Sequence, residues 1–430
     1  MGPEAGLFLL LLFFALLATR TPIHVALGLA AIAIIVMYNL GVKSVSYTFY
    51  ANIAKFPLLA IPFYILAGVV MQKAGMAERL IKLISALFGW MSGGMGIATV
   101  AVALLWGAVS GSGPATVAAL GLILIPGMVA SGYPKPYATA LVSACSELAI
   151  VIPPSIALII YGVITSESVP VLFMGGFMPG LLVGFFFIAL TYLIGKRHGY
   201  TGVPWQGWRA LGATFTEAFW GLMTPVIILG GIYSGIFTPT EAAAVAVFYG
   251  LFVGFFVYRT MNLKSLYELL VESTISTAVV MIVVTFAGLF SWAATTIGIV
   301  EIVAKWILGF SAQPWFLLIL INALLLILGT MLDAISIFYI TLPIFMPLIQ
   351  HMGWSNVWFG LMMTVNLAIG QITPPVAVNL YVGARIARLS IESIWAEAWK
   401  FALVAIIALL IIAYVPDIVL FLPRLTGLIK

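Results

Sequence analysis

Residues 366–382 read NLAIGQITPPVAVNLYV, and this stretch decides how the chain folds. Its apolar run is broken at the centre by small, polar and proline residues: Gly370, Gln371, Thr373, Pro374 and Pro375. Proline lacks an amide hydrogen and clashes with the preceding turn, so a Pro-Pro pair ends a helix. Residues 147–161, ELAIVIPPSIALIIY, are broken in the same way at Pro153 and Pro154. The sequence therefore predicts two apolar helices that are each interrupted midway.

The composition places these helices in a membrane. Of 430 residues, 64% are hydrophobic and only 7% are charged, and the mean hydropathy is +1.22. Soluble proteins carry about 25% charged residues, so this chain lacks the polar surface of a water-soluble globule. Because a bilayer crossing needs roughly 20 apolar residues, the chain has room for many spans. We expect an all-α polytopic membrane protein.

Several function classes lack their signatures here. The net charge of +5 comes from basic residues in loops, so it does not indicate a nucleic-acid partner. The three histidines are scattered without metal-ligand spacing, and the single Cys145 excludes an internal disulfide. An ATP-driven pump needs a Gly-rich phosphate loop, but the Gly195–Lys196 pair continues into Arg197. We expect no enzyme activity and no cofactor other than a coupling ion.

The spacing of apolar runs predicts ten full crossings, near residues 6–19, 25–40, 58–72, 134–163, 169–195, 220–236, 239–258, 276–292, 355–385 and 398–415. Two further runs, 93–130 and 313–350, are broken midway, and each fits either two crossings or one re-entrant helical hairpin; we expect hairpins. With both termini outside, thirteen of the 18 lysine and arginine residues face inside, a clear positive-inside bias. Amphipathic connectors are expected near 43–56, 76–89, 203–219 and 262–274.

The chain contains an internal repeat. Ala67–Gly68 matches Ala287–Gly288, Gly107 matches Gly329, and the first proline pair matches the second, all at nearly constant offset. The predicted topology starts the first copy outside and the second inside, so the copies are inverted. Inverted repeats with interrupted apolar segments are typical of secondary transporters, whose sites lie where the interruptions meet.

This repeat divides the chain into five parts. Residues 1–57 are N-terminal scaffold helices. Residues 58–163 form the first repeat, with hairpin 93–130 and broken helix 134–163. Residues 164–275 hold scaffold helices and interfacial connectors. Residues 276–385 form the second repeat, with hairpin 313–350 and broken helix 355–385, and residues 386–430 end in a scaffold helix.

The helix breaks are candidate binding sites because they free backbone groups inside lipid, where those groups need partners. Freed carbonyls and hydroxyls suit a hard cation such as Na⁺, whereas the amide end of a half-helix suits an anion. The candidates at the first tip are Ser110, Gly111, Ser112, Gly113, Pro114 and Thr116. Those at the first break are Glu147, Pro153, Pro154 and Ser155. Those at the second tip are Gly329, Thr330 and Asp333, and those at the second break are Gly370, Gln371, Thr373, Pro374 and Asn379.

Some of these residues also have plainer interpretations. Small residues such as those in SGSGPAT often serve close helix packing. Asp333 fits either a helix cap or an ion ligand, and Glu241 in FTPTEAAAV fits the support of a helix N-terminus. Carboxylates in a membrane are costly, so Glu147 is the unusual residue. It fits a cation site, a proton carrier, a contact to an amino group of the solute, or a structural acid.

Five strings together identify a family resemblance: GSGPATVAALG, IPPSIALIIYG, IFTPTEAAAVAV, GTMLDAISIFYITLPIFMPL and NLAIGQITPPVAVNLYV. The chain resembles, over essentially its whole length, the large membrane subunit of TRAP (tripartite ATP-independent periplasmic) transporters. That resemblance implies a bacterial inner-membrane protein with an elevator mechanism driven by Na⁺. It also implies a small four-helix membrane subunit, a periplasmic solute-binding protein that delivers the solute, and a small organic acid as solute. Na⁺ is then expected at the tip and break residues.

Two points stay open at this stage. Glu147 departs from the small or apolar residue expected at its position, which raises a zwitterionic solute as an alternative. A stand-alone Na⁺/dicarboxylate carrier of similar hairpin architecture is the nearest rival, and a channel lined by carbonyls is a further one. Dependence on a binding protein separates the first rival from the TRAP interpretation.

Overall fold

The computed structural model describes residues 3–200, 202, 204–310 and 313–429, and this part of the chain is helical without strands. The first half contains α1 (Pro3–Ala18), α2 (Ile23–Met37), α3 (Lys43–Ile53), η1 (Phe56–Leu59), α4 (Ala60–Lys73), α5 (Met76–Phe88), α6 (Gly94–Ser110), α7 (Gly113–Ala130), α8 (Lys135–Cys145), α9 (Leu148–Val151), α10 (Ile156–Thr165) and α11 (Val169–His198). The second half contains α12 (Trp208–Tyr233), α13 (Pro239–Phe252), η2 (Val253–Val257), α14 (Leu263–Thr296), α15 (Ile299–Phe310), α16 (Pro314–Gly329), α17 (Ala334–Met352), α18 (Asn356–Gly370), α19 (Val378–Ala387), α20 (Glu392–Tyr414) and α21 (Asp417–Leu425).

Many of these helices are long and apolar enough to cross a bilayer. Nine such segments occur among the described residues: Phe56–Lys73, Gly113–Ala130, Lys135–Thr165, Val169–His198, Trp208–Tyr233, Pro239–Val257, Leu263–Thr296, Ala334–Met352 and Glu392–Tyr414. Several shorter apolar helices accompany them, including both first arms of the hairpins, α6 and α16. The prediction of an all-α polytopic membrane protein is confirmed.

The two repeats have the same order of elements. In the first, α4 and α5 precede the hairpin α6–α7 and the broken helix α8–α9–α10. In the second, α14 and α15 precede the hairpin α16–α17 and the broken helix α18–α19. The halves also exchange contacts, since α10 packs against α17 and α19 packs against α7. The predicted fold class, with two hairpins and two broken helices in an inverted repeat, is confirmed.

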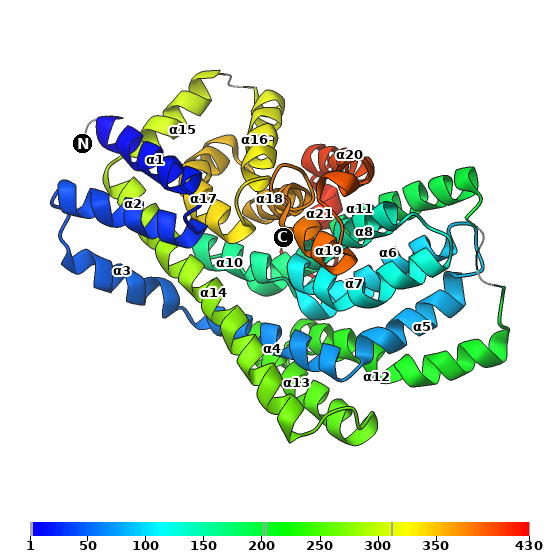
Figure 1. Ribbon diagram of the computed structural model, residues 1–430. Coiled ribbons are helices and arrows are strands. Elements are labelled where there is room, and N and C mark those ends of the chain that lie inside the picture. Colours follow the sequence, from blue (N-terminus) through cyan, green and yellow to red (C-terminus); the bar gives the residue numbers. More distant parts are fainter. Residues whose placement is uncertain (1–2, 201, 203, 311–312, 430) are drawn as a thin grey trace.

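A second group of helices packs around α14, the long helix that runs diagonally across Figure 1. Helices α2, α3 and α4 contact α14, whereas α13 contacts α4 and α12 contacts α5. By contrast, α11 contacts α6, α9 and α18, and α20 contacts α8 and α18. Thus α11 packs directly on α6, the first arm of the first hairpin, and both α11 and α20 pack on the broken helices. The five-part domain division stays a prediction.

Two expected connectors are instead parts of long helices. Most of segment 203–219 lies in α12 (Trp208–Tyr233), and segment 262–274 begins α14 (Leu263–Thr296). Segment 262–274 continues into its apolar run without a proline, whereas α12 continues through Pro225, which lies inside the helix. Asn262 fixes the start of α14, because its side chain accepts a hydrogen bond from the Ser265 amide at 2.8 Å. The amphipathic pieces near 43–56 and 76–89 form α3 and α5.

The N-terminus of α13 shows the capping role predicted for Glu241. Thr238 N donates to Glu241 Oε2 at 2.8 Å, and Glu241 N donates to Thr238 Oγ1 at 3.3 Å. This reciprocal pair satisfies two amide groups that have no partner inside the helix. The interpretation of Glu241 as a helix-start residue is therefore confirmed.

Replacing Thr238 by alanine is expected to lower the free energy of unfolding by about 1 kcal/mol, because one of these amides loses its acceptor. The measurement is thermal unfolding of the purified protein in detergent. Thr216→Ala is the matched control, since the Thr216 hydroxyl bonds only to Gly212 O within its own helix. Equal stability losses in the two variants would contradict the capping role.

Candidate functional site

The tip of the first hairpin lies against the first helix break. Helix α6 ends at Ser110 and α7 begins at Gly113, with Gly111 between them at a φ of +62°. The Ile156 amide donates to Gly111 O at 3.3 Å. A Cβ atom added to Gly111 would lie 2.7 Å from Pro154 O. Glycine is needed here both for the left-handed backbone and for this close approach.

The tip of the second hairpin lies against the second break in the same manner. Helix α16 ends at Gly329, and the Val376 amide donates to Thr330 O at 3.2 Å. A Cβ atom on Gly370 would lie 2.5 to 2.7 Å from backbone atoms of Gly329. The two backbones thus pass each other without intervening side chains.

The breaks themselves span residues 152–155 and 371–377, and both proline pairs contain a cis peptide bond. Ser155 restarts the first helix, because its hydroxyl accepts from the Leu158 amide at 3.3 Å. In the second break, the Asn379 amide donates to Gln371 O at 3.0 Å, and Thr373 Oγ1 donates to Ile369 O at 2.7 Å. These bonds hold each break in one conformation.

A cavity of about 150 Å³ lies at both hairpin tips and at the second break, and the residues Ile150 and Ile156 that flank the first break also line it. Its lining residues come from separate parts of the chain: Gly111, Ser112, Gly113, Pro114, Ile150, Ile156, Ala157, Val280, Asp333, Ala334, Ile335, Gln371 and Val378. We call it the tip cavity. At about 30 Å³ of liquid volume per water, it has room for about five waters. This size suits an ion with some of its water, or a very small solute group.

Buried polar atoms without partners lie beside this cavity. Gln371 Oε1 and both side-chain polar atoms of Asn379 have no hydrogen-bond partner in the described chain, and neither does Thr116 Oγ1. All three residues are less than 9% exposed. A Cβ atom on Gly113 would lie within 3.1 Å of both Asn379 and Gln371. Because an unsatisfied buried polar group costs about 1–3 kcal/mol, this cluster favours a polar or charged occupant.

Asp333 combines the two roles that the sequence left open. Its carboxylate accepts hydrogen bonds from Ser336 N at 3.1 Å and Ser336 Oγ at 2.6 Å, so it caps α17. It also lines the tip cavity. The cap thus places a carboxylate at the wall of a site that otherwise contains neutral polar groups.

A larger cavity of about 490 Å³ adjoins the tip cavity. The two share Ser112, Pro114, Ile156 and Val280 in their walls. Ser110 lines the larger one, together with Gln72 from α4 and Glu272 from α14. Gln72 and Glu272 were not predicted, because neither lies at a helix break. Only the repeat position of α4 and α14 pointed to these helices.

Several candidate residues lie outside the lining of both cavities: Thr116, Glu147, Pro153, Pro154, Ser155, Gly329, Thr330, Gly370, Thr373, Pro374 and Asn379. Most of them shape the breaks or hold a tip against one. Glu147 differs, because it is buried between α8 and α9. The lining residue nearest to it in the sequence is Ile150, about one helical turn later. The structure therefore does not bring Glu147 to the cavity wall.

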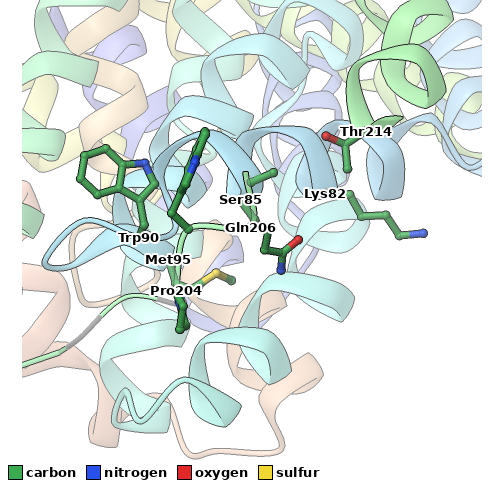
Figure 2. Close-up of a pocket in the computed structure, with 9 residues that line it drawn as sticks. Lys82, Ser85, Trp90, Met95, Pro204, Gln206 and Thr214 are labelled. Carbon is green, nitrogen blue, oxygen red and sulfur yellow. The ribbon is translucent and has the colours of Figure 1, made fainter. Parts of the chain in front are cut away.

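A third cavity, of about 320 Å³, lies away from the tips and breaks, between α5, α12 and the segment before α12 (Figure 2). Lys82, Trp90, Trp205 and Gln206 are among its lining residues. The Trp90 and Trp205 rings meet edge to face, with centroids 6.2 Å apart. Tryptophan is enriched at membrane–water interfaces, so we assign this cavity to the interfacial region of the protein.

The comparison with known families decides the assignment. Residues 10–418 match the family described as "Tripartite ATP-independent periplasmic transporter, DctM component". The chain belongs to this family. It is 37% identical to the C4-dicarboxylate TRAP transporter large permease protein DctM of Rhodobacter capsulatus, covering 97% of this chain and 98% of that one.

A second relative of this DctM-family chain is longer. The isethionate TRAP transporter permease protein DctMQ of Oleidesulfovibrio alaskensis is 42% identical over 95% of this chain, which spans 65% of the length of that protein. Both relatives are described as transporter permeases, and the family itself is one of transporter components. The family resemblance drawn from the five sequence strings is confirmed.

Among solved structures, the YdaH transporter of Alcanivorax borkumensis has the same fold, with a TM-score of 0.62 over 87% of this DctM-family chain and 89% of that chain. The sequences are only 16% identical, so the likeness concerns the fold alone. The arrangement of helices is thus retained at low identity.

Proposed function

We propose that this chain imports a small organic acid together with Na⁺ across the bacterial inner membrane. The observation that carries the proposal is the tip cavity, whose wall combines both hairpin tips, the second break and the residues that flank the first break. The C4-dicarboxylate and isethionate named for two relatives are both organic anions. Among the described residues, no lysine or arginine lines either cavity at the tips, so half-helix N-termini and bound Na⁺ would hold the anion.

The proposed movement is that of an elevator. The hairpins and broken helices carry the solute as one body past the helices around α14, where α4 and α14 face the larger cavity. The faces of α4 and α14 that line the larger cavity support such sliding, because Ile65, Val69, Ile275 and Val279 make them apolar. Apolar faces have no directional bonds to break when they shift relative to each other.

The proposed partners follow from the family, which is described as tripartite. We expect a small four-helix membrane subunit bound to this chain and a periplasmic protein that delivers the solute. From the positive-inside count of the sequence, we expect both termini of this chain on the periplasmic side. A stand-alone carrier is the alternative function, and a zwitterionic solute is the alternative cargo.

Uptake into membrane vesicles tests the proposal. Vesicles would contain this chain with its small subunit, and radiolabelled isethionate or a C4-dicarboxylate would serve as the probe. Uptake is expected only with an inward Na⁺ gradient and a loaded binding protein. Uptake that needs Na⁺ but no binding protein would favour the stand-alone carrier, and uptake that needs neither would refute the proposal.

The Asp333→Asn variant distinguishes the two roles of Asp333, helix capping and ion binding. Asparagine caps helices about as well as aspartate, so stability is expected to stay within about 0.5 kcal/mol. Removal of the charge is expected to raise the Na⁺ concentration for half-maximal uptake by roughly tenfold, equivalent to about 1.4 kcal/mol. Both are measured on the same preparation. Asp417→Asn is the control, because Asp417 pairs with Arg424 at the surface.

An unchanged Na⁺ requirement in Asp333→Asn would assign Asp333 to capping alone. If Asp333→Asn instead loses much stability, a change in its Na⁺ requirement would reflect unfolding and not the loss of an ion ligand. Thermal unfolding is therefore measured before uptake, and Asp333→Ala, which removes the cap as well, is expected to be the less stable of the two by about 1 kcal/mol.

A further inference from the structure

Glu147 is a buried carboxyl group without a partner. It is 1% exposed, the lowest exposure of any aspartate or glutamate in the described chain. Neither Oε1 nor Oε2 accepts a hydrogen bond. It lies between α8, which ends at Cys145, and α9, which begins at Leu148. A carboxylate in such a place needs a compensating cation or a proton.

The helices packed on α9 supply no cation. Of these, α6, α7, α10 and α18 contain no charged residue, and the basic residues of α11 lie in its last turn. Helix α11 meets the segment after α9 at Gly180, whose added Cβ would touch Ile152. From Gly180 to Lys196 is about 24 Å along the helix at 1.5 Å per residue. Cys145 ends α8 two residues before Glu147, and Tyr161 of α10 donates to Asn356 O. Helix α8 and the two helices α19 and α20 packed on it carry further titratable groups: Lys135, Tyr137, Tyr381, Arg385, Glu392, Glu397, Lys400 and Tyr414. Among the described residues, none of the basic groups forms an ion pair with Glu147.

The local backbone also offers few ligands for a metal ion. Carbonyl groups around Glu147 already accept hydrogen bonds, at Val142, Ser143, Ala144, Ser146, Glu147, Leu148 and Ile150. Hard cations require several oxygen ligands, and a carbonyl that already accepts a hydrogen bond has only its second lone pair left to offer. A proton needs only the carboxyl group itself. The second repeat has Asn366 before its own Leu-Ala-Ile, a neutral amide that donates to Asn322 Oδ1 at 2.8 Å.

We propose that Glu147 is a proton-binding site of the first broken helix and holds a proton in this conformation. The occupied form is a neutral carboxylic acid, equal in charge to Asn366 of the second repeat. This proton site is separate from the Na⁺ site proposed at the tip cavity, because Glu147 lies one helical turn behind Ile150 in the cavity wall. Solute contact with Glu147 is not part of the proposal.

Infrared spectroscopy tests directly whether the Glu147 carboxyl group is protonated. A protonated carboxylic acid has a carbonyl stretch that an ionised carboxylate lacks, and exchange into D₂O shifts it. Purified protein in lipid nanodiscs at neutral pH is expected to show one such band. Glu147→Gln is expected to lose the band, and Glu268→Gln, a change at an exposed glutamate of α14, is expected to keep it. Addition of Na⁺ is expected to leave the band unchanged.

Two results would overturn the proposal. Absence of a band that depends on Glu147 in Na⁺-free buffer would show an ionised group. Loss of the band on addition of Na⁺ would show a cation site in place of a proton site. If Glu147→Gln folds poorly, labelling with ¹³C-glutamate identifies the band as a glutamate band in the wild-type protein, and Glu147→Leu serves as the second variant.

Thermal unfolding across pH gives an independent reading. A carboxyl that is neutral when folded and ionised when unfolded makes the folded state lose stability as pH rises above the ordinary range for glutamate. Glu147→Gln has no such proton to lose. Its unfolding temperature is therefore expected to exceed that of the wild type by a margin that grows with pH, and a constant margin would contradict the proposal. Neither reading needs transport activity, so failure here is distinguishable from failure of the proposed import function.

Discussion

Replacing Gly113 by valine is expected to reduce solute uptake by at least about tenfold, a loss equivalent to about 1.4 kcal/mol of binding free energy. The first side-chain carbon would lie 2.8 Å from Asn379 Nδ2 and 3.1 Å from Gln371 Oε1. Those two side chains carry unpaired polar atoms beside the tip cavity. Valine would displace them and fill part of a cavity of about 150 Å³.

Gly127→Val is the matched control in the same helix. A Cβ atom there meets only the flexible end of Met95, at 3.6 Å. Uptake is measured in vesicles with the partner proteins and is normalised to the amount of folded chain in the membrane. Gly113→Val with uptake equal to that of Gly127→Val would show that solute and ion bind elsewhere. The expected pattern is loss of uptake with retention of folded protein.

Replacing Gly370 by alanine is expected to lower the stability of the chain as well as its uptake. The added carbon would lie 2.5 Å from the Gly329 carbonyl carbon and 2.7 Å from the Gly329 oxygen. These are backbone atoms, which cannot rotate away, so α16 and α18 must separate. Overpacking of this kind costs about 1–3 kcal/mol.

Gly230→Ala provides the comparison for this variant. Gly230 is helical and exposed, and an added carbon meets nothing within 4 Å. Because alanine favours helices over glycine by up to about 1 kcal/mol, this control is expected to be as stable as the wild type or more so. Thermal unfolding in detergent makes the comparison. If the Gly370→Ala protein is as stable as the control, the close approach of the Gly329 and Gly370 backbones does not limit which residue position 370 can hold.

The sequence predicted the tips and breaks because their residues contrast with their surroundings. Glycine, proline and hydroxyl residues such as Ser112 and Pro374 stand out in a chain that is 64% hydrophobic. Each one alters backbone geometry in a way that needs no knowledge of distant contacts. Their proximity to one another followed from the repeat, whose fold class is confirmed.

The walls of the site could not be predicted in the same way. Ile150, Val280 and Val378 line the tip cavity, but each is one apolar residue among many and carries no local signal. The meeting of Gly113 with Asn379 depends on how α7 packs on α19, which is a long-range contact. Glu147 shows the converse, since its charge stood out although it lies between α8 and α9 and does not line the tip cavity. The number and positions of Na⁺ ligands stay a prediction.

The exchange of contacts between the repeats has a consequence for how the protein is made. Helix α7 leaves the ribosome long before α19, yet each completes the surroundings of the other. Until the second half is inserted, the first tip lacks the Asn379 and Gln371 side chains that lie against Gly113. The site is therefore complete only after the second half has been inserted, and a nascent chain halted before residue 378 would have the hairpin α6–α7 but no finished site.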